Sequence, residues 1–263
     1  MIKVLFFGDV VGRIGRDSLF KKLPMLKQLY SPDLLIINGE NSANGKGITN
    51  RIYDAYKKNG IDCITSGNHI FDNKDIVDSI DSLSDMIRPI NYPRATPGNK
   101  IFVKKINGVK VAVINILGQV FMPPIDNPFQ CMDDLLCSEL QDIPVIIVDI
   151  HAEATSEKKA FGCHFAGRVS AVLGTHTHVP TADRQIINNY TGFISDVGMV
   201  GAADSILGMA KENVITKFLT QVPVKFAPPE TDLQVQMDYV YMEINEDGST
   251  EKIEAFHDFI PVA

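Results

Sequence analysis

Short apolar runs alternate with amphipathic segments of helical length through the first half of the chain. Each apolar run predicts a strand, and the segment that follows it predicts a helix. We expect strands at Ile2–Phe7, Leu34–Asn38 and Cys63–Thr65, and helices at Arg16–Tyr30, Thr49–Asn59 and Asn73–Ser82. This alternation is typical of βαβ units, which build a parallel sheet.

The later part of the chain adds antiparallel strands. Asn107-Gly108 separates two strand-like runs, which is a strong hairpin signal. Asn245–Gly248 separates two more and predicts a closing hairpin, whereas the proline-containing stretch Met122–Pro128 predicts a loop. The strands expected here are Lys100–Ile106, Val109–Ile116, Val145–Val148, Val169–Leu173, Leu233–Ile244 and Ser249–Phe256, with a helix at Ser156–Phe165. Because no repeat or composition break divides the chain, we expect one domain over residues 1–263.

Composition narrows the class of protein. A hydrophobic fraction of 45% and a charged fraction of 22% are typical of a soluble globular chain. The net charge of -7, without a basic block, argues against long nucleic acids and membrane surfaces as partners. The N-terminal apolar run reaches Asp9 too early for a signal peptide, and no run approaches the roughly 20 residues of a membrane span. We therefore expect a cytoplasmic protein, and a homo-oligomer stays an open alternative.

Five polar clusters follow strand-like runs. Because carboxyl ends of parallel strands meet at one edge of a sheet, we expect these clusters to lie together. They contain four of the six histidines in the chain. The clusters are Gly8-Asp9, Asn38-Gly39-Glu40-Asn41, Gly67-Asn68-His69, Asp149-Ile150-His151 and Gly174-Thr175-His176-Thr177-His178.

These clusters favour a metal site. A lone histidine is most often a structural group, but four at equivalent strand ends favour metal binding. Carboxylate, amide oxygen and imidazole are ligands that divalent metals prefer. Glu40 is the best candidate for a bridging ligand, since its two oxygens are able to join two cations. His176 and His178, two residues apart on an extended segment, present two rings to neighbouring positions.

These motifs resemble, in order, those of the calcineurin-like metallophosphoesterases. The resemblance is closest to their YmdB-like bacterial group, as in Gly8–Arg13, Asn38–Asn41 and Asp196–Met199. It implies a four-layer α-β-β-α sandwich with two mixed β-sheets. It also implies hydrolysis of 2′,3′-cyclic nucleotides, a small phosphorylated substrate, and two divalent or trivalent transition metal ions, iron or manganese.

The resemblance also implies ligand roles. One metal is expected on Asp9, Glu40, Asn41 and His178, and the other on Glu40, Asn68, His151 and His176. Three positions depart from the general superfamily pattern. Val11 stands where a histidine ligand is usual, Glu40 replaces an aspartate, and Ile70 replaces the acid that often follows the Asn-His pair.

A dimetal site suggests a mechanism. Two cations lower the pKa of a bridging water, whose hydroxide attacks phosphorus. His69, left without a metal, is expected to protonate the departing sugar oxygen. Arg13 and Arg16 are candidate phosphate contacts, or solvated residues at a helix start. Asp183 and Asp196 are candidates for positioning the site, or for capping turns.

The sequence also suggests three alternative functions. Gly8, Gly12 and Gly15 after a strand suggest a dinucleotide site, but the glycine spacing is wrong for that motif. A slow or vestigial enzyme that acts as a metal- or nucleotide-binding regulator fits the missing histidine. A phosphomonoesterase or protein phosphatase would use the same metal site.

Overall fold

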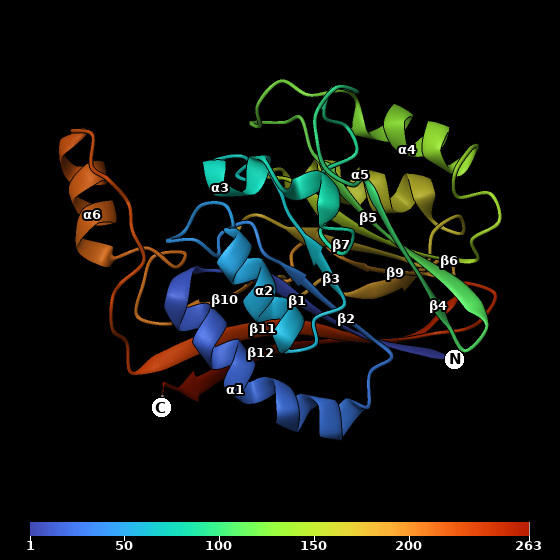
Figure 1. Ribbon diagram of the computed structural model, residues 1–263, viewed down its shortest axis with the longest axis horizontal. Coiled ribbons are helices and arrows are strands. Elements are labelled where there is room, and N and C mark those ends of the chain that lie inside the picture. Colours follow the sequence, from blue (N-terminus) through green and yellow to red (C-terminus); the bar gives the residue numbers. More distant parts are fainter. Residues whose placement is uncertain (263) are drawn as a thin grey trace.

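The computed structural model describes residues 1–262 and contains two six-stranded mixed sheets with helices on their outer faces (Figure 1). In the first sheet, the strand order is β12-β11-β10-β1-β2-β3, and β1 runs parallel to β2 and β10 but antiparallel to β11. Its strands are β1 (Ile2–Val10), β2 (Leu34–Asn38), β3 (Cys63–Thr65), β10 (Met199–Ala202), β11 (Gln234–Ile244) and β12 (Thr250–Pro261).

The second sheet has the order β4-β5-β6-β7-β9-β8, with a parallel centre and antiparallel edge strands. Its strands are β4 (Ile101–Ile106), β5 (Val109–Leu117), β6 (Val145–His151), β7 (Ala171–Thr175), β8 (Gln185–Ile187) and β9 (Thr191–Ile194). The predicted hairpin between β4 and β5 is confirmed: Asn107 and Gly108 have φ values of 48° and 91°, as a two-residue turn between twisted strands requires.

Alternating side chains place the two sheets between helices. In β1, Val4 and Phe6 pack against the second sheet, whereas Leu5 and Phe7 pack toward α1 (Gly12–Tyr30). Helix α2 (Asn50–Lys58) adds to this outer layer, while α4 (Pro128–Leu136) and α5 (Thr155–Phe165) cover the second sheet. The expected four-layer sandwich is therefore confirmed, and burial of apolar side chains on both faces stabilises the central strands.

Two predicted helices needed correction. The helix expected at Arg16–Tyr30 begins earlier, at Gly12, directly after β1. The helix expected at Asn73–Ser82 is broken into α3 (Lys74–Val77) and the 3₁₀ turn η1 (Ile80–Ser82). Ser79 lies at the break, and its hydroxyl oxygen lies 2.6 Å from Oδ1 of Asn50 and 3.2 Å from the carbonyl oxygen of Ile76, so its hydrogen is shared between these acceptors. Such local side-chain bonds compete with continued helix.

Several elements lacked a sequence prediction: α4, β8, β9, β10 and α6 (Lys211–Thr220). The expected loop before α4 is present, but Pro128 is already the first helical residue, and Asn127 caps the helix by accepting from the backbone N–H of Phe129 and Gln130. The strands β9 and β10 have four residues each, too few for a clear apolar pattern. No helix within residues 1–262 combines the length and apolar character needed to cross a bilayer.

Candidate active site

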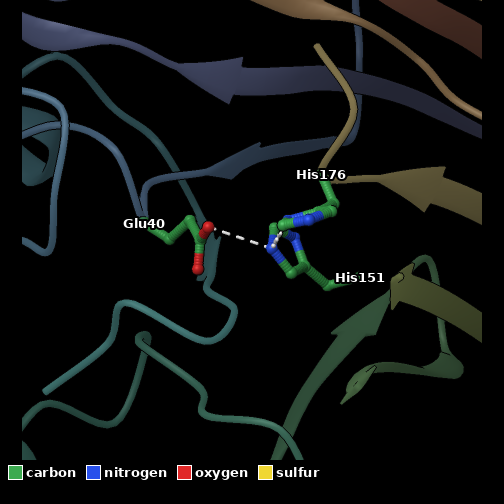
Figure 2. Close-up of side chains that lie close together, drawn as sticks. All are labelled: Glu40, His151 and His176. Atoms are coloured by element: carbon green, nitrogen blue, oxygen red, sulfur yellow. Dashed lines mark hydrogen bonds and ion pairs between the residues drawn. The ribbon is translucent and has the colours of Figure 1, made fainter. Parts of the chain in front are cut away.

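The carboxyl ends of strands from both sheets meet at one edge of the sandwich, where the predicted polar residues lie. Asp9 is near the end of β1, and His151 is the last residue of β6. Glu40 follows β2 by two residues, and His176 directly follows β7. Figure 2 shows the side chains of Glu40, His151 and His176 close together, with Glu40 and His176 both joined to His151. The two sheets therefore build the expected cluster jointly.

The most closely spaced set of candidate metal ligands, which we call the His151 group, consists of Glu40, Asn68, His151 and His176. Around Nε2 of His151 lie Oε1 of Glu40 at 2.9 Å, Nδ1 of His176 at 3.0 Å and Oδ1 of Asn68 at 3.1 Å. Nε2 of His176 lies 3.1 Å from Oε2 of Glu153. When this nitrogen donates its hydrogen to Glu153, the Nδ1 lone pair of His176 faces the other donors.

A second set, the His178 group, consists of Asp9, Asn41 and His178. Nε2 of His178 lies 3.2 Å from Oδ1 of Asn41 and 3.9 Å from Oδ1 of Asp9. Nδ1 of His178 donates to the carbonyl of Leu207 at 2.9 Å, and the amide nitrogen of Asn41 donates to the carbonyl of Gly45 at 3.0 Å. These two bonds turn a nitrogen lone pair and an amide oxygen toward Asp9.

Both groups fit metal ions. Two neighbouring ligand atoms that each lie about 2.1 Å from a metal ion are about 3 Å from each other. This distance matches the separations around Nε2 of His151. A single hydrogen on that nitrogen is able to satisfy only one of the three facing atoms, whereas a cation satisfies all of them. Oδ1 of Asp9 is buried and has no hydrogen-bond partner among residues 1–262. A buried acceptor without a donor is expected to face a cation.

Gly67 leaves room for this cluster. A Cβ atom added at Gly67 would overlap Oε2 of Glu40 and would lie 2.5 Å from Nε2 of His151. Only glycine therefore allows the loop after β3 to pass so close to these side chains. Gly67 directly precedes Asn68 and His69 in the sequence, and it permits this close approach.

The charges within the His151 group interact strongly. Burial alone raises the pKa of Glu40, but the charge of His151 outweighs it and lowers this pKa to about 2. Burial lowers the pKa of His151, and the charge of Glu40 overcomes it and raises this pKa to about 9. Burial and the charge of His151 lower the pKa of His176 to about 3. In the metal-free protein, a proton on His151 therefore sits where a cation would bind.

A buried carboxylate beneath the cluster was not predicted to have a role. Asp149 accepts hydrogen bonds from Oγ1 of Thr65 at 2.5 Å, Oγ1 of Thr175 at 2.6 Å and Nδ2 of Asn38 at 3.0 Å. Since the Thr175 hydroxyl gives its hydrogen to Asp149, it accepts from Nδ1 of His151, 2.9 Å away. Nε2 of His151 is then directed into the cluster. The only signal in the sequence was the position of Asp149 two residues before His151.

His69 lies beside the His151 group but outside its set of donors. Its backbone N–H donates to Oε2 of Glu40 at 3.0 Å, and its Nδ1 lies 2.9 Å from Oδ2 of Asp72. Asp72, three residues after His69, is thus the carboxylate that contacts the His69 ring. The His69 side chain also lines a cavity of about 620 Å³ together with Glu40 and His176.

The predicted substrate contacts lie elsewhere. Arg16 donates to the backbone carbonyl of Ser42, and Arg13 donates to that of Glu230 at 3.2 Å. Asp183 accepts from the hydroxyl of Ser195 at 2.6 Å and from that of Thr181 at 2.7 Å. None of Arg13, Arg16 and Asp183 lines the cavity beside Glu40, so their contact with substrate stays a prediction.

Asp196 has a clearer place near the site. Its Oδ2 forms a buried ion pair with Nζ of Lys158 at 2.7 Å and accepts from the backbone N–H of Thr177 at 3.1 Å. Lys158 also donates to the carbonyl of Thr175 at 2.8 Å. Asp196 thus holds the loop between His176 and His178 and does not contact the cavity itself. The role of Lys158 was not predicted, because a lysine in an amphipathic helix is normally exposed, whereas Lys158 is buried.

Two mixed sheets between helices, with acid, amide and histidine donors at their carboxyl ends, define the metallophosphoesterase class. The model of the YmdB-like protein family matches residues 5–256. The chain belongs to this family, which confirms the resemblance inferred from the motifs.

Three similar proteins illustrate the relationship. A 2′,3′-cyclic-nucleotide 2′-phosphodiesterase of Bacillus subtilis is 49% identical over 229 residues, which cover 87% of each chain. The crystal structure of a novel phosphatase of Mycoplasma pneumoniae has 35% identity and a TM-score of 0.92, covering 98% of this chain and 93% of that one. A hypothetical protein of Thermus thermophilus has 36% identity and a TM-score of 0.91, covering 99% of this chain and 100% of that one.

Proposed function

We propose that this protein is a metal-dependent phosphodiesterase that hydrolyses 2′,3′-cyclic nucleotides. The observation that carries the proposal is the convergence of two donor groups, one around His151 and one around His178, beside a single cavity. The similarity to the Bacillus subtilis enzyme named above supports the cyclic nucleotide as substrate and the P–O2′ bond as the one that breaks.

We assign two metal positions to these groups. Asp9, Asn41 and His178 would hold one ion, Asn68, His151 and His176 the other, and Glu40 would bridge them. The donor set of oxygens and imidazole nitrogens suits iron or manganese. Bound there, the ions would activate water and neutralise charge on the phosphoryl oxygens.

His69 is the proposed general acid. Its ring lines the cavity, and its backbone N–H is tied to Glu40, so it is held beside the His151 group. Asp72 accepts the Nδ1 hydrogen and leaves Nε2 to give a proton to the departing O2′ oxygen as the P–O2′ bond breaks. The product would be a nucleoside 3′-phosphate with a free 2′-hydroxyl.

The remaining expectations are part of the same proposal. We propose a single domain, since the core between the sheets contains residues from both parts of the chain, such as Phe6 and Leu173. A cytoplasmic location and a small phosphorylated partner stay predictions, and the oligomeric state stays open.

The test is a substrate panel with the metal content measured on the same sample. A cyclic nucleotide, a chromogenic phosphodiester, a phosphomonoester and a phosphopeptide are compared. We expect the highest kcat/KM for the cyclic nucleotide, with the 3′-phosphate as product. Glu40→Gln should lower this value by about a thousandfold or more, while the exposed control Glu139→Gln leaves it unchanged. The proposal would be refuted if the metal-loaded protein did not hydrolyse the cyclic nucleotide, or if it hydrolysed monoesters with a higher kcat/KM.

A further inference from the structure

A second cavity, of about 820 Å³, is also lined by His178. It shares Val179, Leu207 and His178 with the cavity of the candidate active site. Its remaining walls come from the segment that leads to β8, from strands β10, β11 and β12, and from the loop after β10. The volume falls within the range of small-molecule sites. Neither the metal positions nor the proposed hydrolysis needs this cavity.

A buried carboxylate orients a histidine in this cavity. Asp238 of β11 lies opposite His257 of β12 in the sheet, and its side chain is fully buried. Oδ2 of Asp238 accepts from the backbone N–H of Met199 at 2.9 Å and from the amide of Gln236 at 2.6 Å. Oδ1 is then left for Nδ1–H of His257, 2.6 Å away. In the neutral imidazole, Nε2 of His257 is therefore an acceptor, and it has no partner within residues 1–262.

An unpaired cation lines the same cavity. The side chain of Arg184 is exposed, and no carboxylate or carbonyl within residues 1–262 pairs with it. Its guanidinium is therefore available to an anionic ligand in the cavity. Met199 and Leu207 add apolar surface to the walls. The cavity thus combines a guanidinium, a hydrogen-bond acceptor and apolar contacts.

We propose that this cavity is a second ligand site that binds an organic phosphate monoester of about the size of a nucleoside monophosphate. The anionic oxygens of a phosphate pair with the guanidinium of Arg184. A phosphate monoester has a second pKa near 6, so at about pH 6 a large fraction of it is the monoanion, which carries an O–H that donates to Nε2 of His257. A carboxylate has no such hydrogen. The organic part of the ligand contacts Met199 and Leu207.

Isothermal titration of the metal-free protein tests the site, because the candidate active site then has no cations to attract phosphate. The probes are adenosine monophosphate, inorganic phosphate and adenosine. We expect saturable binding of adenosine monophosphate with a Kd below about 1 mM, at least tenfold weaker binding of inorganic phosphate, and no binding of adenosine. Absence of saturable binding of the monophosphate, or equal binding of adenosine, would overturn the proposal.

Variants locate the binding. Arg184→Ala should weaken binding of adenosine monophosphate at least tenfold, and Arg184→Lys should weaken it less, since a charge remains. The matched control Arg94→Ala removes another exposed arginine, which lines neither cavity, and should leave Kd unchanged. Lys46→Ala changes the cavity of the candidate active site instead. If Lys46→Ala abolishes binding while Arg184→Ala does not, the monophosphate occupies the active site and the proposed second site is wrong.

Discussion

The His151 group and the His178 group lie at the same edge of the sandwich, but they are held in different ways. Three candidate ligand atoms surround Nε2 of His151 at 2.9 to 3.1 Å. In the His178 group, Asp9 is 3.9 Å from the nearest ring nitrogen of His178. His151 is the last residue of a buried strand and is oriented by Thr175 and Asp149. His178 is oriented by a backbone carbonyl of an irregular loop, that of Leu207.

This difference has a consequence for metal affinity. A group whose donors are preorganised by buried strands loses little freedom when a cation binds. A group that depends on loop residues has to be ordered further. The His178 group is also the one whose usual histidine ligand is replaced by Val11. We therefore expect the His151 group to bind its metal more tightly than the His178 group.

Removal of each histidine is the strongest test of this comparison. His151→Ala should lower kcat/KM for the cyclic nucleotide by about a thousandfold or more and leave less than one metal per chain. His178→Ala should keep the metal of the His151 group and lose the other. Elemental analysis of the purified proteins measures both, with the exposed His164→Ala as control. Equal metal loss in the two variants would show that the groups do not differ.

His69→Ala should separate proton transfer from metal binding. We expect both metals to stay bound and turnover of the cyclic nucleotide to fall by roughly a hundredfold or more. A substrate with a good leaving group, such as a nitrophenyl phosphodiester, needs less protonation and should lose much less. Asp72→Asn should also lower turnover of the cyclic nucleotide more than that of the nitrophenyl diester, but by a smaller factor than His69→Ala. Equal losses on both substrates would exclude His69 as the general acid.

Thr175→Val should weaken only the His151 group. Without the hydroxyl, Nδ1 of His151 has lost its acceptor, and we expect the affinity for one metal to fall about 10- to 100-fold. Thr65→Val is a matched control, because Thr65 also donates to Asp149 but does not contact His151. Metal titrations followed by calorimetry compare the two. If the metal affinity falls equally in both variants, the loss comes from the missing hydrogen bond to Asp149 and not from the orientation of His151.

The smallest expected effect is a release of protons. The pKa of His151 is raised to about 9 in the metal-free protein, so near pH 7.5 the ring carries a proton that a metal has to displace. Metal affinity should therefore rise as pH rises toward about 9 and then level off. Calorimetry in buffers of different ionisation enthalpy should detect about one proton released. No release at pH 7.5 would show that His151 is already neutral.

Much of the fold could be predicted because local patterns and burial agree. The runs at Leu34–Asn38 and Cys63–Thr65 have the predicted strand bounds, since fully buried strands need continuous apolar residues. The helix predicted at Thr49–Asn59 is present as α2, and its first predicted residue, Thr49, is the N-cap. The short strands β9 and β10 were missed, because four residues carry too little periodicity. Pairing with long neighbouring strands decides their structure, and that pairing is invisible in the local sequence.

The chain's own sequence determined which residue types stand at the strand ends, and hence the class of chemistry: acids, amides and histidines in the order that a metallophosphoesterase requires. Only the tertiary structure decided how they are grouped and oriented. Asp149, Thr175 and His151 form a chain of hydrogen bonds across two strands, and Asp72 reaches His69 from the next turn. Such partners are defined by distances in space: the pairing of β6 with β7 places Thr175 beside His151, and the turn after β3 brings Asp72 to the ring of His69.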